Sequence, residues 1–216
     1  MMIPTKEAMQ QCWDGRFPLR LFQILQSSSV SIAGLGGLGS HIAVMLARSG
    51  IGKLHLVDFD CVDMSNLNRQ AYDIGHIGQQ KTEALSQILF KINPYIEIVT
   101  DTLRVTAENA PKLFSASSIV CEAFDQPEQK AMLVNTLLEK CPHTTIVSGN
   151  GMAGYGSANT IQTKKFHERL YICGDQKTDI QWGIGLMAPR VCVCAGHQAN
   201  QVISILLEGA NEEIDK

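Results

Sequence analysis

The chain has 216 residues, enough for one domain with a buried core, and its apolar share of 45% and charged share of 18% are those of an ordinary globular protein. Its formal net charge of −3 offers no basic field for nucleic acid and no cationic anchor for an acidic membrane. No segment is apolar over the length of a bilayer or typical of a signal peptide, so we expect neither. The cysteines are odd in number and form no CxxC pair, which favours a reducing, cytoplasmic setting and argues against a disulfide framework or a zinc site.

Helices and strands are predicted to alternate through most of the chain. A short amphipathic helix is expected at 16–27, in an N-terminal helical segment of residues 1–28. The elements that follow are a strand at 29–34, a helix at 37–50 with Gly50 as its C-cap, a strand at 53–60, a polar loop at 61–78, a helix at 79–92, a strand at 96–103, a short helix at 106–114, a strand at 117–125, a helix at 127–140 that starts at Pro127, and a strand leading into a glycine-rich loop at 144–156.

The alternation stops after residue 156. Segments 159–165 and 169–175 are expected to form short antiparallel strands, and 196–209 a closing helix. Cys192 and Cys194 alternate in "RVCVCAG", a spacing that suits packing residues on one face of a strand. The whole pattern predicts an α/β fold: a Rossmann-like, doubly wound, mostly parallel sheet flanked by helices, with a short antiparallel extension near the C-terminus. We expect a single domain over residues 1–216.

Glycines and carboxylates follow several of the predicted strands. In a doubly wound sheet, ligands bind beyond the carboxyl ends of the strands. The first strand leads into Gly34, Gly36, Gly37 and Gly39 at the start of a helix, an arrangement that brings backbone N–H groups to a nucleotide phosphate. Asp58, after the second strand, is near the spacing at which an acid binds ribose hydroxyls; Asp60 either joins it or caps its own loop.

The loop "SNLNRQ" distinguishes between kinds of nucleotide chemistry. Asn66, Asn68, Arg69 and Gln70 stand together, and Lys81 follows at the start of a helix. Arginine forks around phosphate oxygens, and a lysine ammonium in this position reaches a triphosphate; the alternative is that both cations are solvated surface charges. A dehydrogenase would need few of these groups.

Asp125 ends the strand "IVCEAFD". A carboxylate there suits Mg²⁺ beside a triphosphate, because Mg²⁺ takes one or two protein carboxylates and keeps several waters. Alternatively, Asp125 is the N-cap of the next helix. Glu122, three residues earlier, points either into the sheet or into the site. The histidines at 41, 76, 143, 167 and 197 show no metal-ligand spacing.

Taken together, these motifs resemble a known superfamily. "GLGGLGS", "LVDFDCVDMSNLNRQ", "GQQKTEAL", "INP" and "EAFDQPEQKAMLVN" resemble the ThiF/MoeB/ubiquitin-activating-enzyme superfamily. "SGNGMAGYGSANTIQT", "LYICGD" and "GLMAPRVCVCAGHQAN" are similar to its short ThiF-type branch, ThiF family two. The resemblance covers residues 30 to 208.

The resemblance implies an ATP-dependent adenylyltransferase that activates the C-terminal glycine carboxylate of the sulfur carrier protein ThiS for thiamine thiazole synthesis, acting as a homodimer. Gly37 and its neighbours would line the phosphates and Asp58 would hold the ribose. Asn66, Arg69 and Lys81 would bind the triphosphate, and Asp125 would bind Mg²⁺. The glycine run 149–156 would border a channel for the carrier's diglycine tail, or would simply form a tight turn.

Some family features have no clear counterpart here. The paired CxxC zinc region of longer relatives is missing. Some relatives supply an arginine to the partner subunit's ATP, and here Arg16 or Arg20 would have to serve. Cys173 is either a covalent carrier site or a buried strand residue. Alternative functions are activation of another ubiquitin-like carrier or carboxylate, such as a molybdopterin-synthase subunit or a modified tRNA base, an NAD(P)-dependent oxidoreductase, and a non-catalytic carrier-binding scaffold.

Overall fold

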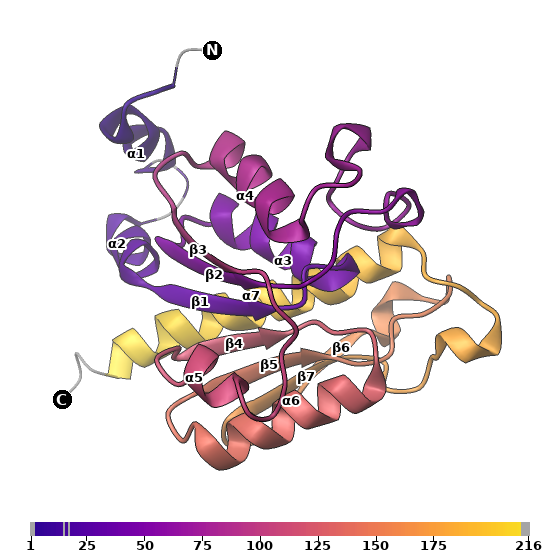
Figure 1. Cartoon of the computed structure of the whole chain (residues 1–216). Helices are drawn as coiled ribbons and strands as arrows, with labels where there is room; N and C mark the ends of the chain where they lie inside the picture. The colour runs from indigo at the N-terminus through magenta and orange to yellow at the C-terminus, as the bar shows by residue number, and fades with distance from the viewer. Residues whose placement is uncertain (1–2, 15, 17, 213–216) are drawn as a thin grey trace.

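A computed structural model describes residues 3–14, 16 and 18–212, which build a seven-stranded sheet with helices on both faces (Figure 1). The strands are β1 (Ser29–Ala33), β2 (Lys53–Val57), β3 (Glu97–Asp101), β4 (Ile119–Glu122), β5 (Thr145–Gly149), β6 (Gln162–His167) and β7 (Leu170–Gly174). Their order is β3-β2-β1-β4-β5-β7-β6, and every neighbouring pair is parallel except β6–β7. The predicted fold class is therefore confirmed, including the short antiparallel extension.

Two groups of helices cover the sheet. The helices are α1 (Lys6–Asp14), α2 (Leu19–Ser27), α3 (Gly37–Arg48), α4 (Lys81–Ile92), α5 (Ala110–Phe114), α6 (Pro127–Lys140) and α7 (Ala188–Glu212), with short 3₁₀ helices at Met64–Asn66, Ile74–His76, Ala158–Thr160 and Ile180–Trp182. On one face α3, α4 and α7 bury the larger apolar cluster, which includes Ile42, Leu85 and Val202. On the other, α5 and α6 bury a smaller one around Phe114 and Leu133. Because helices cover both faces, the central strands β1 and β4 are buried along almost their whole length, as is usual for parallel sheets.

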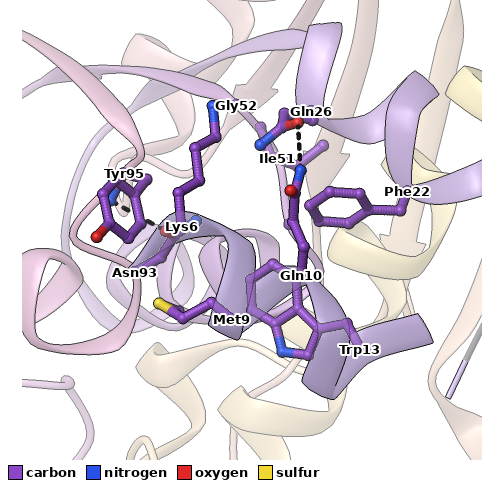
Figure 2. Close-up of a pocket in the computed structure, with 11 residues that line it drawn as sticks. Lys6, Met9, Gln10, Trp13, Phe22, Gln26, Ile51, Gly52, Asn93 and Tyr95 are labelled. Carbon is purple, nitrogen blue, oxygen red and sulfur yellow. Dashed lines mark hydrogen bonds between the residues drawn. The ribbon is translucent and has the colours of Figure 1, made fainter. Parts of the chain in front are cut away.

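The N-terminal segment differs from the prediction. The expected helix at 16–27 begins instead at Leu19, after Pro18, and a separate helix α1 precedes it; positions 15 and 17 lie outside the described residues. Figure 2 shows α1 against α2, where the Trp13 and Phe22 ring centroids are 5.3 Å apart. The pocket between them has a volume of about 10 Å³, which suffices for about one water molecule and excludes a nucleotide.

The C-terminal helix α7 corrects a second prediction. It starts at Ala188, so Cys192 and Cys194 lie on a helix and not on a strand. Because residues two apart diverge around a helix, Cys194 is fully buried while Cys192 is only half-buried. Helix α7 packs along α3, and it also contacts α2, β5, β6 and β7, so tertiary contacts support a helix in this segment. Although α7 is 25 residues long, no described helix has the length and apolar character to cross a membrane.

Candidate functional site

A cavity of about 570 Å³ opens at the carboxyl ends of the parallel strands. Segments that follow β1, β2, β3, β4, β5 and β7 line it, together with the first turn of α7. The neighbours β1 and β4 send their connections to opposite faces of the sheet, so a crevice forms between them. Figure 1 shows loop 61–80 and the segments after β5 and β7 at this same end of the sheet. The volume is that of a site for a nucleotide-sized ligand.

The glycine loop after β1 brings backbone donors to the cavity. Gly34 has φ of +90°, and a side-chain carbon there would lie 2.9 Å from the Ala123 carbonyl oxygen, so only glycine fits. The first helical bond of α3 runs from Ser40 N to Gly36 O, which leaves the preceding amides outside the helical ladder, and no side chain of the described residues caps this end. Gly36 and Gly37 line the cavity, so this helix end is suited to an anion.

Gly39 has a different role from the other predicted glycines. A side-chain carbon at Gly39 would lie 1.8 Å from the Gly34 carbonyl oxygen, and the residue does not line the cavity. It permits α3 to pack closely against the loop, and its contribution to nucleotide binding would be indirect.

Asp58 connects the end of β2 to the glycine loop. Its side chain accepts hydrogen bonds from the amides of Leu35 (2.6 Å) and Asp60 (2.8 Å), and the residue is 8% exposed. Burial is the largest influence and raises the pKa of Asp58, while the Lys81 charge and these amides oppose it. Asp58 lies in the cavity wall, in the position of the ribose-binding acid of a dinucleotide fold.

Lys81 is the first residue of α4 and is paired with Asp60. Its Nζ lies 2.9 Å from Asp60 Oδ2, and its amide donates to the Asp60 carbonyl. Lys81 is only 6% exposed and lines the cavity, so the alternative of a solvated surface charge is wrong. A loop-capping carboxylate would accept a hydrogen bond from a nearby backbone amide. The Asp60 carboxylate instead pairs with the Lys81 ammonium.

Arg69 extends from the polar loop to the cavity wall. Its Nη1 donates to Ser65 O (3.0 Å) and to Asn68 Oδ1 (2.8 Å). Asn68 itself does not line the cavity, so it acts on the guanidinium and is not positioned to contact a ligand in this arrangement.

The two other amides of the loop do reach the cavity. The side-chain oxygen Oδ1 of Asn66 accepts a hydrogen bond from Asp63 N (3.0 Å), in a reciprocal cap that shapes the 3₁₀ helix at Met64–Asn66. Gln70 is 8% exposed, and its Oε1 has no hydrogen-bond partner among the described residues. A buried acceptor without a partner is costly, so a ligand donor at this wall would stabilise the site.

Asp125 lies at the mouth of the cavity, beyond β4. The N-cap of α6 is Gln126, without a side-chain capping bond, so the capping role predicted for Asp125 is wrong. Within the described part of the chain, no three His, Cys, Asp or Glu side chains gather closely enough to hold a metal ion. The exposed carboxylate of Asp125 nevertheless fits Mg²⁺, because this ion can take its remaining ligands from phosphates and water.

Glu122 does not line the cavity, and its side chain contacts β5 and α6. It is fully buried and accepts hydrogen bonds from Phe124 N (2.7 Å) and Ser148 Oγ (2.6 Å). Lys130 of α6 neutralises it, with Nζ 2.9 Å from Oε2. Lys130 also lines the cavity and was missed in the sequence, because nothing local marks it as the partner of Glu122.

Arg104 and Phe59 form a second unpredicted part of the wall. The Arg104 guanidinium carbon lies 4.2 Å from the centroid of the Phe59 ring, a cation–π contact. Phe59 stands between the two acids that follow β2, and Arg104 comes just after β3. The strand-end rule, applied to β3 as well, would have found Arg104.

The opposite wall consists of two segments, one after β5 and one after β7. Residues 149–153, the first part of the predicted glycine run, line the cavity, and so do residues 178–181, which the sequence did not indicate. The rest of the run turns away, with Gly154 N bonded to Gly185 O. The run therefore contains both a cavity wall and a turn.

Cys173 is fully buried in β7, and burial raises its pKa to about 11. This favours the packing alternative over a covalent carrier site. Arg16 and Arg20 do not line the cavity of their own chain, and a role for either in a dimer stays a prediction.

Comparison with known proteins identifies the family. The family model described as "ThiF family" matches residues 14–216. The chain belongs to the ThiF family. The molybdopterin-synthase adenylyltransferase of Salmonella typhimurium is 31% identical to this ThiF-family chain over 192 residues, which cover 85% of this chain and 75% of the relative.

Two further relatives show the range of the family. The adenylyltransferase and sulfurtransferase UBA4 of Scheffersomyces stipitis is 34% identical over 138 residues, 63% of this chain. The match spans only 31% of UBA4, so the chain accounts for under a third of that protein. The crystal structure of Escherichia coli tRNA N6-threonylcarbamoyladenosine dehydratase, TcdA, in complex with ATP superposes with a TM-score of 0.87, covering 97% of this chain and 99% of TcdA at 20% identity. That likeness establishes the shared fold.

Proposed function

We propose that the protein is an ATP-dependent adenylyltransferase that activates a carboxylate. The observation that carries this proposal is the convergence, in one cavity, of an open helix N-terminus, a ribose-type acid and two cations. These groups come from residues far apart along the chain: Gly36, Gly37, Asp58, Arg69 and Lys81. The names of the relatives from Salmonella typhimurium and Scheffersomyces stipitis support the same chemistry.

ATP would lie across the ends of β1, β2 and β4. In this proposal, Asp58 accepts hydrogen bonds from the ribose hydroxyls, and the amides at the start of α3 donate to phosphate oxygens. Arg69 and Lys81 neutralise the triphosphate, and Asp125 binds a Mg²⁺ ion shared with it. When bound, Mg²⁺ would supply further charge neutralisation to the phosphates.

The reaction needs alignment and charge neutralisation more than a protein nucleophile. A carboxylate oxygen of the substrate attacks the α-phosphorus, and the bond from that phosphorus to the bridging oxygen breaks. Pyrophosphate leaves with the electron pair, and an acyl-adenylate remains. Two anions must approach each other, so Arg69 and Lys81 matter most where charge develops on the leaving group.

The substrate in this proposal is the C-terminal glycine carboxylate of a ubiquitin-like carrier, with ThiS as the specific carrier. The wall at residues 149–153 includes Gly149, Gly151 and Ala153, whose lack of bulk suits a thin diglycine tail. The named relatives point to other substrates, a molybdopterin-synthase subunit among them, so a panel of carriers is needed. A homodimer in the cytoplasm completes the proposal.

Pyrophosphate release tests the proposal directly. The wild-type chain is incubated with ATP, Mg²⁺ and each of several purified carriers, with and without the terminal Gly-Gly; we expect release only with an intact tail. Calorimetry with ATP–Mg²⁺ and with NADH distinguishes adenylylation from hydride transfer.

Substitutions at the charged residues of the cavity test the role proposed for each of them. Arg69→Ala and Asp125→Ala are expected to lower the rate by roughly 10²- to 10³-fold while the fold stays intact. Arg48→Ala, at the far end of α3, and Glu128→Ala, an exposed acid in the first turn of α6, are matched controls outside the cavity and should keep normal rates. Near-normal ATP–pyrophosphate exchange in Arg69→Ala or Asp125→Ala would contradict the proposed roles.

A further inference from the structure

A buried arginine joins three segments beside the cavity. Arg190, in the first turn of α7, is 4% exposed. Its Nη1 donates to the carbonyls of Gly156 (3.0 Å) and Ser157 (2.7 Å), and its Nη2 donates to Thr160 Oγ1 (3.0 Å) and to the Asp175 carboxylate. One guanidinium therefore binds the loop after β5, the 3₁₀ helix before β6 and the end of β7.

Asp175 extends this connection to the cavity wall. Its Oδ1 accepts hydrogen bonds from the amides of Lys177 and Thr178, both 2.9 Å, and its own amide donates to the Gly151 carbonyl (2.8 Å). Gly151 and Thr178 line the cavity. The Arg190–Asp175 pair is thus one bond away from both segments of the wall opposite the nucleotide loop.

The backbone at this point is unusual. Gln176, next to Asp175, has φ of +58° and is the one non-glycine residue with positive φ in the described part of the chain. Its amide donates to the Asn150 carbonyl (3.1 Å), and a side-chain carbon at Gly151 would lie 2.3 Å from Asp175 Oδ1. Such a conformation persists only where surrounding contacts over-determine it, and strain of this kind concentrates at ligand sites.

The sheet order separates this wall from the nucleotide side. Strands β2 and β1, which lead into Asp58 and the glycine loop, lie on one side of β4; β5 and β7, which lead into the Arg190–Asp175 wall, lie on the other. The two halves face each other across the cavity, with Asp125 after β4 between them.

We propose that Arg190 and Asp175 are positioning residues for the carboxylate substrate: they hold residues 150–153 and 178–181 in the shape that receives the substrate's peptide tail, and they leave ATP binding unaffected. This inference rests on the proposed adenylylation. In this proposal the tail contacts residues 150–153 and 178–181, so its affinity depends on where these two segments lie. Small misplacements of a reacting group are costly.

Lysine and asparagine substitutions test the pair with little change in shape. Arg190→Lys keeps the charge but cannot span four acceptors, and Asp175→Asn keeps the size but loses the charge-assisted bond. With the carrier that the wild-type chain adenylates best, both variants are expected to raise KM for the carrier roughly tenfold while KM for ATP stays within about twofold.

A matched control lies at the opposite end of the sheet. Arg169 also uses its guanidinium to bind three backbone carbonyls, those of Leu138, Cys141 and Thr144, at 2.8–2.9 Å. Arg169→Lys should lower the melting temperature without changing the ratio of the two KM values.

The outcomes are distinct. Equal rises in both KM values, or no rise in either, would overturn the positioning role while leaving adenylylation in place. If neither Arg190→Lys nor Asp175→Asn folds, the pair is a determinant of stability and the inference is also overturned. If the wild-type chain releases no pyrophosphate with any Gly-Gly carrier, the proposed function fails first. The expected result is a raised KM for the carrier in both Arg190→Lys and Asp175→Asn, together with normal ATP binding by calorimetry.

Discussion

Replacing Gly36 by alanine separates a glycine needed for binding from one needed for packing. A side-chain carbon at Gly36 would have Gln70 Nε2 as its nearest neighbour, at 3.8 Å, which is an ordinary van der Waals contact. The ligand-free chain should therefore fold normally, with a loss of free energy of unfolding under about 1 kcal/mol from the altered helix N-cap. Gly36→Ala nevertheless places a methyl group beside the amides that we assign to the phosphates.

The expected loss falls on phosphate binding alone. Displacing a phosphate oxygen from one backbone amide removes a hydrogen bond to a charged group, worth about 1.5–3 kcal/mol. ATP affinity should then fall about 10- to 100-fold. Adenosine, which lacks phosphates and relies on the wall around Asp58, should bind as tightly as it does to the wild-type chain.

Calorimetry with ATP–Mg²⁺ and with adenosine measures the two affinities, and urea unfolding measures stability. The comparison variant is Gly39→Ala, whose added carbon would lie 1.8 Å from a backbone oxygen and should cost about 3 kcal/mol or more of stability. A folded Gly36→Ala chain with wild-type ATP affinity, or with ATP and adenosine affinities reduced alike, would refute the reasoning.

Three further predictions concern buried groups. Lys130→Met leaves the fully buried Glu122 carboxylate without its counter-charge and should cost about 3 kcal/mol in urea unfolding; the double variant with Glu122→Gln should recover much of this, and an equal loss in the double variant would count against the pairing. Because burial raises the pKa of Asp58, adenosine affinity measured by calorimetry should fall as the pH drops from neutrality toward that raised pKa, where the carboxylate takes up a proton; Asp58→Asn should show weak binding without this pH dependence. Cys173, with its pKa raised to about 11, should resist iodoacetamide in the native chain while the exposed Cys61 is alkylated, as read by mass spectrometry; equal labelling would show that Cys173 is accessible.

Much of the fold was predictable because its signals are local. Helix α6 spans Pro127–Lys140 as predicted, since proline at the first turn and a helical period mark it within one segment. The strand ends carrying Gly34 and Asp58 were placed for the same reason. The start of α7 was not predicted, because "VCVC" suits a strand locally, whereas in the fold this segment is a helix that packs against α3 and neighbouring strands.

Some residues of the candidate site were likewise predictable from local signals, and others were not. Residue type, together with a position after a strand or in the polar loop leading to α4, was enough to indicate that Asp58, Arg69, Lys81 and Asp125 would line the cavity. They did not indicate that Asn68 lies off the cavity wall or that Arg104 lies on it.

By itself, the sequence determined the order of the elements and the chemistry at each strand end, because turn residues and apolar periodicity act over a few neighbouring positions. Only the tertiary structure decided which charges meet: Lys81 with Asp60, Lys130 with Glu122, and Arg190 with Asp175. Each of these pairs joins residues separated in the chain, and their proximity follows from strand order and helix packing, which no local pattern encodes.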